Sequence, residues 1–138
     1  MKLSDSIPGA RKFTWAEALF LRKWAFHAYP ADDVVENIIK IALVLQMIRN
    51  FYDKRIYVHS WYRPDAYNQF VHGAPFSAHR SGLAVDFHVD GYTCKDVRSY
   101  LEPRLEQFGI RMEDKTMNWV HIDARDPGPQ GRLFQRGI

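Results

Sequence analysis

Apolar residues recur at helical spacing in the first half of the chain. Within residues 33–52 they occupy every third or fourth position, and further apolar residues widen this stripe until little of its middle is left for water. The positions at helical spacing are Val35, Ile38, Ala42, Leu45 and Ile48. We therefore expect a central core helix here, begun by a cap that Asp33 and Glu36 form.

An earlier helix is predicted from about Trp15 to His27. Thr14 and Glu17 fit a capping box, in which each side chain satisfies a free backbone N–H at the start of a helix. Three aromatic residues of this segment are expected to pack in the core: Trp15, Trp24 and Phe26.

The pattern changes to short elements in the second half of the chain. Residues 56–61 are β-branched and aromatic, which is typical of a strand, and the strand must end before Pro64 because proline cannot donate to a ladder. The elements expected after it are a helix at Ala66–Val71, a strand at Leu83–Val89, a helix at Val97–Phe108 interrupted or restarted at Pro103 and capped by Gly109, and strands around Ile110–Met112 and Asn118–Ala124. Helices come first and strands mostly afterwards, which predicts an α+β fold with a small, mainly antiparallel sheet packed against helices.

Composition limits the size of the fold and the kinds of partner. At 138 residues, of which 46% are hydrophobic, the chain can bury one sizeable core, so we predict a single domain over residues 1–138. The net charge of +3 is spread over 19 basic and 16 acidic residues without a block of like charges, which argues against a nucleic-acid partner. No apolar run is long enough for a signal-peptide core or a membrane span, so we expect synthesis in the cytoplasm without a signal peptide.

Two histidines and an aspartate form the candidate metal site. His79 and Asp86 lie in one stretch, and His121 lies far downstream in a segment able to pair as a neighbouring strand. Two imidazoles and a carboxylate are three ligands for a zinc ion whose fourth position stays open for water, which is a catalytic composition. A closed thiolate site is excluded because Cys94 is the only cysteine. Asp86 also interrupts an apolar strand, where a buried carboxylate is costly unless a cation or hydrogen-bond donors meet it.

Other residues around this site have expected supporting roles. Gly82 permits a tight approach between the His79 loop and the strand, and the Ser77 hydroxyl can cap the loop or orient His79. His88 lies two residues beyond Asp86, on the same strand face, as a possible neighbour of the ligands. Trp61 and Trp119 are close to site residues and are candidates to line a cleft.

These motifs resemble a known superfamily. Residues 77–86 read S-A-H-R-S-G-L-A-V-D and match S-x-H-x-x-G-x-A-x-D, the first zinc motif of the superfamily that holds the zinc D-Ala-D-Ala carboxypeptidases, the vancomycin-resistance dipeptidases, the L-alanyl-D-glutamate endolysins of phage and the Hedgehog signalling domain. Residues 119–123, W-V-H-I-D, resemble the aromatic-Val-His-x-Asp ending of its small phage and bacterial branch. Residues 60–68, S-W-Y-R-P-D-A-Y-N, are similar to that branch's S-G-Y-R-S-P-x-Y-N, with Trp61 in place of glycine. The resemblance covers roughly residues 13–134.

The resemblance implies zinc ligands at His79, Asp86 and His121, and a substrate-facing role for Arg63. It implies a zinc peptidase that acts on peptidoglycan stem peptides at a bond involving a D-amino acid, as a D-Ala-D-Ala carboxypeptidase or an endolysin-like endopeptidase. In such an enzyme zinc acidifies a water and polarises the scissile carbonyl, while Arg63 stabilises the developing oxyanion. We expect a monomer that reaches the cell wall when it is released, as in phage lysis.

The position of the general base departs from this family pattern. The carboxypeptidase and dipeptidase branches have a glutamate three residues before the last histidine, where this chain has Asn118, and an amide cannot take a proton. Asp123 is the favoured replacement, with Glu113 or Asp114 as alternatives. An equally strong alternative is that Asp123 supports one of the metal ligands or forms a salt bridge with Arg125. The missing glutamate also supports a second function, a catalytically weak or inactive zinc-containing domain that binds the cell wall or serves as a structural phage component.

Overall fold

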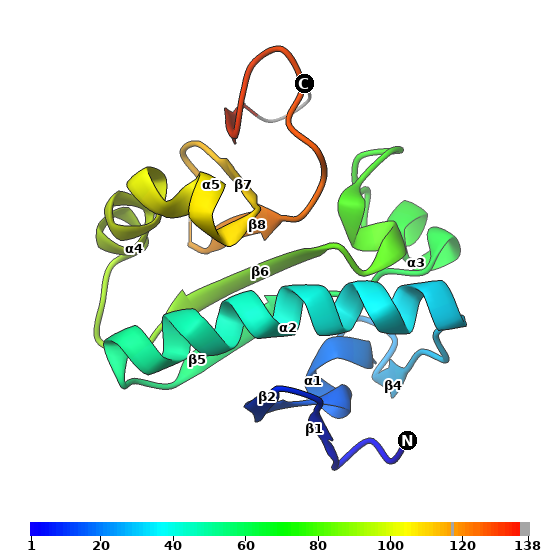
Figure 1. The fold of residues 1–138 in the computed structure, drawn as a ribbon. Helices are drawn as coiled ribbons and strands as arrows, with labels where there is room; N and C mark the ends of the chain where they lie inside the picture. The colour runs from blue at the N-terminus through cyan, green and yellow to red at the C-terminus, as the bar shows by residue number, and fades with distance from the viewer. Residues whose placement is uncertain (117, 136–138) are drawn as a thin grey trace.

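The computed structural model describes residues 1–116 and 118–135, and its main feature is a five-stranded sheet in the order β5-β6-β8-β7-β9 (Figure 1). Its strands are β5 Ile56–Ser60, β6 Ala84–Val89, β7 Arg111–Glu113, β8 Val120–Asp123 and β9 Leu133–Phe134. All neighbours pair antiparallel except β7 and β9, which pair parallel. The prediction of an α+β fold with a mainly antiparallel sheet is confirmed.

The remaining elements surround this sheet. Two short hairpins are formed by β1 Ser6–Ile7 with β2 Ala10–Thr14, and by β3 Phe20–Leu21 with β4 Phe26–His27. The helices are α1 Trp15–Leu19, α2 Asp32–Tyr52, α3 Asp65–Phe70, the 3-10 turn η1 Ala78–Ser81, α4 Cys94–Leu101, the 3-10 turn η2 Glu102–Arg104 and α5 Leu105–Phe108. Of the described helices, none combines the length and the apolar character needed to cross a membrane.

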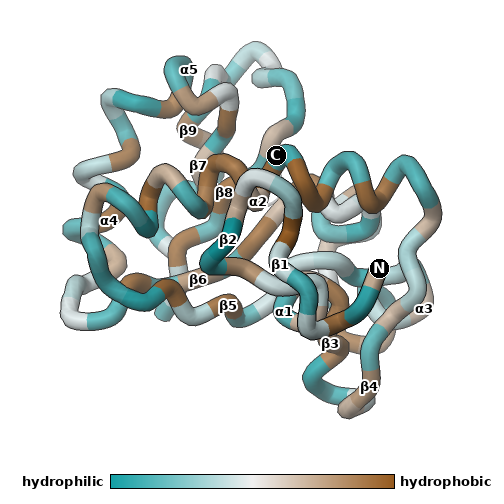
Figure 2. The backbone as a smooth tube through the Cα atoms, turned by 60° about the horizontal axis from the view of Figure 1, so that its bottom comes forward, coloured by the Kyte–Doolittle hydropathy of each residue, from teal (hydrophilic) through white to brown (hydrophobic). Residues whose placement is uncertain are grey.

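Helix α2 is the central core helix that the apolar pattern predicts. It runs along the sheet beside β5 and β6 (Figure 1), and its residues Ile38, Ile41 and Leu45 are fully buried. Hydrophobic segments of β6, β7 and β8 gather in the interior of the molecule (Figure 2). The predicted Asp33 cap is wrong, because the N-cap is Ala31, two residues earlier, and it makes no side-chain hydrogen bond. Asp32 and Asp33 instead lie in the first turn, where the positive end of the helix dipole stabilises their carboxylates.

The first helix is much shorter than predicted. The capping box of Thr14 and Glu17 is present, but the helix ends at Leu19 and the chain continues as the β3-β4 hairpin. The hairpin buries Leu21 in a second small cluster, away from the main core. That cluster consists of Leu21, Ala28 and Tyr67 with Trp24, Tyr62 and Val71 packed against it. The prediction that Phe26 lies in the core is also wrong, since its side chain is 52% exposed and stacks on Trp24.

The two faces of the sheet differ in character, and this difference positions the site. Side chains alternate along a strand, so Val85 and Phe87 of β6 enter the core while Asp86 points to the opposite face. Ile122 of β8 likewise enters the core, and its neighbour His121 shares the face of Asp86. The polar residues of β6 and β8 therefore meet on the sheet face that α2 does not cover.

Candidate metal centre

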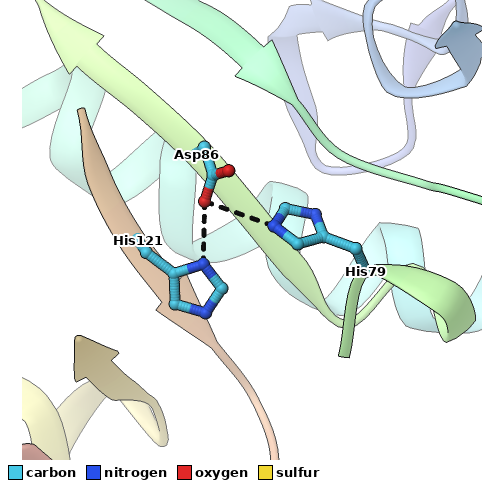
Figure 3. A group of neighbouring side chains, drawn as sticks. All are labelled: His79, Asp86 and His121. Carbon is cyan, nitrogen blue, oxygen red and sulfur yellow. Dashed lines mark hydrogen bonds and ion pairs between the residues drawn. The ribbon is translucent and has the colours of Figure 1, made fainter. Parts of the chain in front are cut away.

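The pairing of β6 with β8 brings two of the predicted ligands together. Asp86 and His121 are direct cross-strand partners, although 35 positions separate them in the chain. The Oδ1 atom of Asp86 lies 2.7 Å from Nδ1 of His121 and 3.2 Å from Nε2 of His79 (Figure 3). One carboxylate oxygen thus lies between two imidazole nitrogens.

The 3-10 turn η1 presents His79 to this pair. The Ser77 hydroxyl caps the turn by accepting a hydrogen bond from the backbone N–H of His79. Nδ1 of His79 lies 2.7 Å from the backbone carbonyl oxygen of Trp61, which can only accept, so Nδ1 carries the proton. The Nε2 atom is therefore the nitrogen available to a cation, and it faces Asp86.

Gly82 ends the turn in a conformation that glycine favours. Its φ is +78°, and a Cβ at this position would lie 3.0 Å from Cγ1 of Ile38 and 3.3 Å from the backbone oxygen of Val34. The turn that carries His79 thus packs directly against α2. We expect Gly82→Ala to lower the free energy of unfolding by about 1–3 kcal/mol, through left-handed backbone strain and this close approach. Thermal or denaturant unfolding measures the loss, and an unchanged stability would contradict it.

His121 is held from its second nitrogen. Its Nε2 lies 3.3 Å from Oδ2 of Asp123, and both oxygens of Asp123 accept hydrogen bonds from Arg111, at 2.8 and 2.9 Å. A second bond to Oδ1 comes from the backbone N–H of Arg125. The expected salt-bridge partner of Asp123, Arg125, therefore contributes its backbone, and Arg111 supplies the ion pair. Sequence reasoning missed Arg111; the available signal was a charged residue between the apolar Ile110 and Met112.

Burial and neighbouring charges set the protonation of these groups. Burial lowers the pKa of His79, although the neighbouring Asp86 carboxylate acts in the opposite direction. Burial alone would raise the pKa of Asp86, but the imidazoles of His79 and His121 outweigh it and hold this pKa below the ordinary value. For His121, burial opposes the charged form, yet the Asp123 and Asp86 carboxylates raise its pKa to about 9. A bound cation would replace the proton on Nδ1 of His121, because an imidazole binds a metal through an unprotonated nitrogen.

The donor set fits a zinc ion. One ligand atom each from His79, Asp86 and His121 lies within 4.8 Å of the others, and the described residues hold no second group of three such side chains. Nε2 of His79 and Nδ1 of His121 are the nitrogens turned toward the carboxylate, and each ring is fixed from its other nitrogen, as metal-ligating histidines usually are. Two nitrogens and one oxygen suit a three-ligand zinc site with an open position.

Arg63 lies beside the three candidate ligands. Its Nη2 is 3.4 Å from Oδ2 of Asp86, and its Nε donates to the Ser60 hydroxyl at 2.9 Å. The Nη1 atom is 3.4 Å from Oδ1 of Asn68. A turn arginine at this position could instead pair with the nearby Asp65, but Asp65 pairs with Arg80. The guanidinium is thus oriented by three side chains at the edge of the site.

A cleft of about 470 Å³ opens over these residues. The three candidate ligands and Arg63 line it, together with Ser77, Glu113, Asp114, Trp119 and Asp123. Trp61 does not line it, because its side chain is 1% exposed and packs against Phe13. His88 contacts His59 instead, with 2.6 Å between the two ring nitrogens, and Asn118 is an exposed residue beside that pair.

Comparison with known families agrees with this geometry. The family model described as Peptidase M15 matches residues 14–123, which is most of the chain. The chain belongs to the peptidase M15 family. M15 peptidases are zinc-dependent enzymes that act on peptidoglycan, and the matched range contains the three candidate ligands and Arg63. No curated protein matches the chain. The segment from Ala124 onward, including β9, lies outside the M15 match.

Proposed function

We propose that the protein is a zinc peptidase that cleaves peptidoglycan stem peptides at a bond involving a D-amino acid. The observation that carries the proposal is the placement of His79, Asp86 and His121 within reach of one cation in a cleft, in a chain of the M15 family. The cleft has the volume of a small-molecule or short-peptide site.

The proposed roles follow from the contacts of each residue. Bound zinc would supply a Lewis acid that acidifies water and polarises a carbonyl. His79 Nε2, Asp86 and His121 Nδ1 would hold it, and Arg63 would donate to the carbonyl oxygen as negative charge develops there. The three side chains that orient Arg63 support this role, because a donor that is already in place needs no reorganisation during the reaction.

Two candidates for the general base differ in their surroundings. Asp123, which the sequence favoured, is 1% exposed and uses both oxygens for Arg111, with further bonds to His121 and to the Arg125 backbone. These contacts support the alternative role, orientation of His121. The Glu113 side chain lines the cleft, makes no hydrogen bond or ion pair among the described residues, and shares the β7 face of Arg111 by alternation. We therefore propose Glu113 as the group that takes the proton from water.

Arg63→Lys tests the oxyanion role. Lysine keeps the charge but loses the planar fork that donates to several partners at once. We expect the turnover number to fall about 10²-fold while zinc stays bound, the scale of one lost transition-state donor. Steady-state kinetics with metal analysis measures both quantities, and parental turnover would assign Arg63 to the fold.

Digestion of purified muropeptides by the zinc-loaded protein, followed by mass spectrometry, tests the function itself. Loss of a terminal D-alanine identifies a carboxypeptidase, and an internal cut identifies an endopeptidase. Asn118 occupies the position of the family's usual glutamate, is exposed and lies outside the cleft. These properties favour a second candidate function, a zinc-containing domain that binds the cell wall without cleaving it. Binding of the cell wall without any cleaved product would establish that second function.

A further inference from the structure

A buried ion pair stands behind His121, on the side away from the other two candidate ligands. Arg111 is 7% exposed, Asp123 is 1% exposed, and two parallel hydrogen bonds of 2.8 and 2.9 Å join them. The remaining contact of Asp123 with a side chain is the 3.3 Å approach to Nε2 of His121. A carboxylate so buried needs such partners, because an unpaired charge there is costly. Arg111 therefore holds Asp123 in the position from which it meets His121.

The C-terminal strand β9 covers this ion pair. Phe134 is 8% exposed, and its ring centroid lies 5.8 Å from that of His121 with the rings nearly perpendicular. The Arg111 guanidinium carbon lies 4.1 Å from the centre of the same ring. Phe134 thus contacts both the candidate ligand and the arginine that fixes its partner.

Backbone hydrogen bonds hold β9 in this place. The N–H of Met112 donates to the Arg132 carbonyl and the N–H of Asp114 donates to the Phe134 carbonyl, both at 2.7 Å. These bonds make β9 the edge strand beside β7, from which Arg111 also comes. The M15 match ends at residue 123, so Phe134 reaches the centre from a part of the chain that the family match leaves out.

We propose that Arg111, Asp123 and Phe134 form a positioning clamp that selects which nitrogen of His121 faces the metal. This inference rests on the proposed zinc site. An imidazole can turn either nitrogen toward a cation, and the hydrogen bond made by the other nitrogen decides between them. The Asp123 carboxylate accepts from Nε2–H, Arg111 keeps that carboxylate in place, and Phe134 packs against the ring so that it does not rotate away. Nδ1 is left facing Asp86, at 2.7 Å.

Two substitutions test the clamp through metal binding. Arg111→Lys keeps a cation but cannot make both hydrogen bonds, and Phe134→Leu keeps an apolar side chain but removes the ring. We expect Arg111→Lys to weaken zinc binding by about 10–100-fold, as the loss of a ligand's supporting partner does, and Phe134→Leu to weaken it by roughly 10-fold. Competition with a chelator measures both. Nitrogen-15 NMR of the zinc-loaded protein should show Nδ1 of His121 bound to metal in the parent and a mixture of both nitrogens in the variants.

The chain offers a matched control pair away from the site. Arg104 lies over the Tyr100 ring, 4.2 Å from its centre, in an arrangement like that of Arg111 and Phe134. Arg104→Lys and Tyr100→Leu should leave zinc affinity and the His121 signals unchanged. Thermal melting identifies any variant that fails to fold. If Arg111→Lys is unfolded, the zinc affinity and His121 signals of Phe134→Leu test the clamp.

Folded clamp variants that bind zinc within twofold of the parent, through Nδ1, would overturn the clamp. A different result would contradict the proposed function. If the parent binds zinc through Nδ1 but cleaves no muropeptide, the clamp proposal is unaffected and the peptidase proposal is wrong. A parent that binds no zinc removes both proposals.

Discussion

Replacing His79, Asp86 or His121 by alanine is expected to abolish stable zinc binding and, with it, peptide cleavage. Each residue supplies one of three ligand atoms that lie within 4.8 Å of one another, and a catalytic zinc site needs three protein ligands to hold the ion firmly. The parent should bind about one zinc per chain. Elemental analysis after chelation and reloading measures the metal, and muropeptide digestion measures the activity.

His27→Ala is a suitable control for these substitutions. His27 is half-buried on β4, where its ring contacts Phe20 and takes no part in the candidate site. This variant should keep its zinc and its activity. A parent that takes up no metal after reloading, or ligand variants that retain a full equivalent of zinc, would remove the basis of the metal centre.

The second large effect is expected for Glu113→Gln. If Glu113 takes the proton from water, the amide should leave zinc binding intact and lower turnover by about 10²–10⁴-fold, the usual contribution of a positioned general base. Asp114→Asn is the matched comparison, because Asp114 is adjacent and also lines the cleft but lies in the turn that follows β7. Steady-state kinetics at saturating zinc separates the two variants, and equal turnover in Glu113→Gln and the parent would exclude this base.

Asp123→Asn completes the comparison and should behave differently. Because Asp123 supports His121, its amide should weaken zinc binding by about 10–100-fold, while activity largely recovers when zinc is raised to saturation. A turnover that stays low at saturating zinc would return the role of base to Asp123.

Much of the fold could be predicted from local sequence patterns. The apolar stripe of α2, the Thr14 capping box, the break at Pro103 and the Gly109 cap each depend on residues a few positions apart, and the structure contains all of them. The prediction failed where distant contacts outweigh local preference. Residues 20–28 form a hairpin because Leu21 is buried against Tyr67, which lies 46 positions further along the chain. The short strands β1, β2 and β9 were also missed, and each is defined by its pairing with another strand.

The sequence by itself determined the residue types of the site and their grouping into His79, Asp86 and His121, because a spaced motif and one ionised residue in an apolar strand can be read without coordinates. Only the tertiary structure decided how these groups are held. The pairing of β6 with β8 sets Asp86 opposite His121, and the pairing of β7 with β8 brings Arg111 to Asp123. β9 then adds Phe134 from outside the M15 match. Which nitrogen of His121 faces the cleft depends on these registers, and register is set by packing between strands that are distant in the chain.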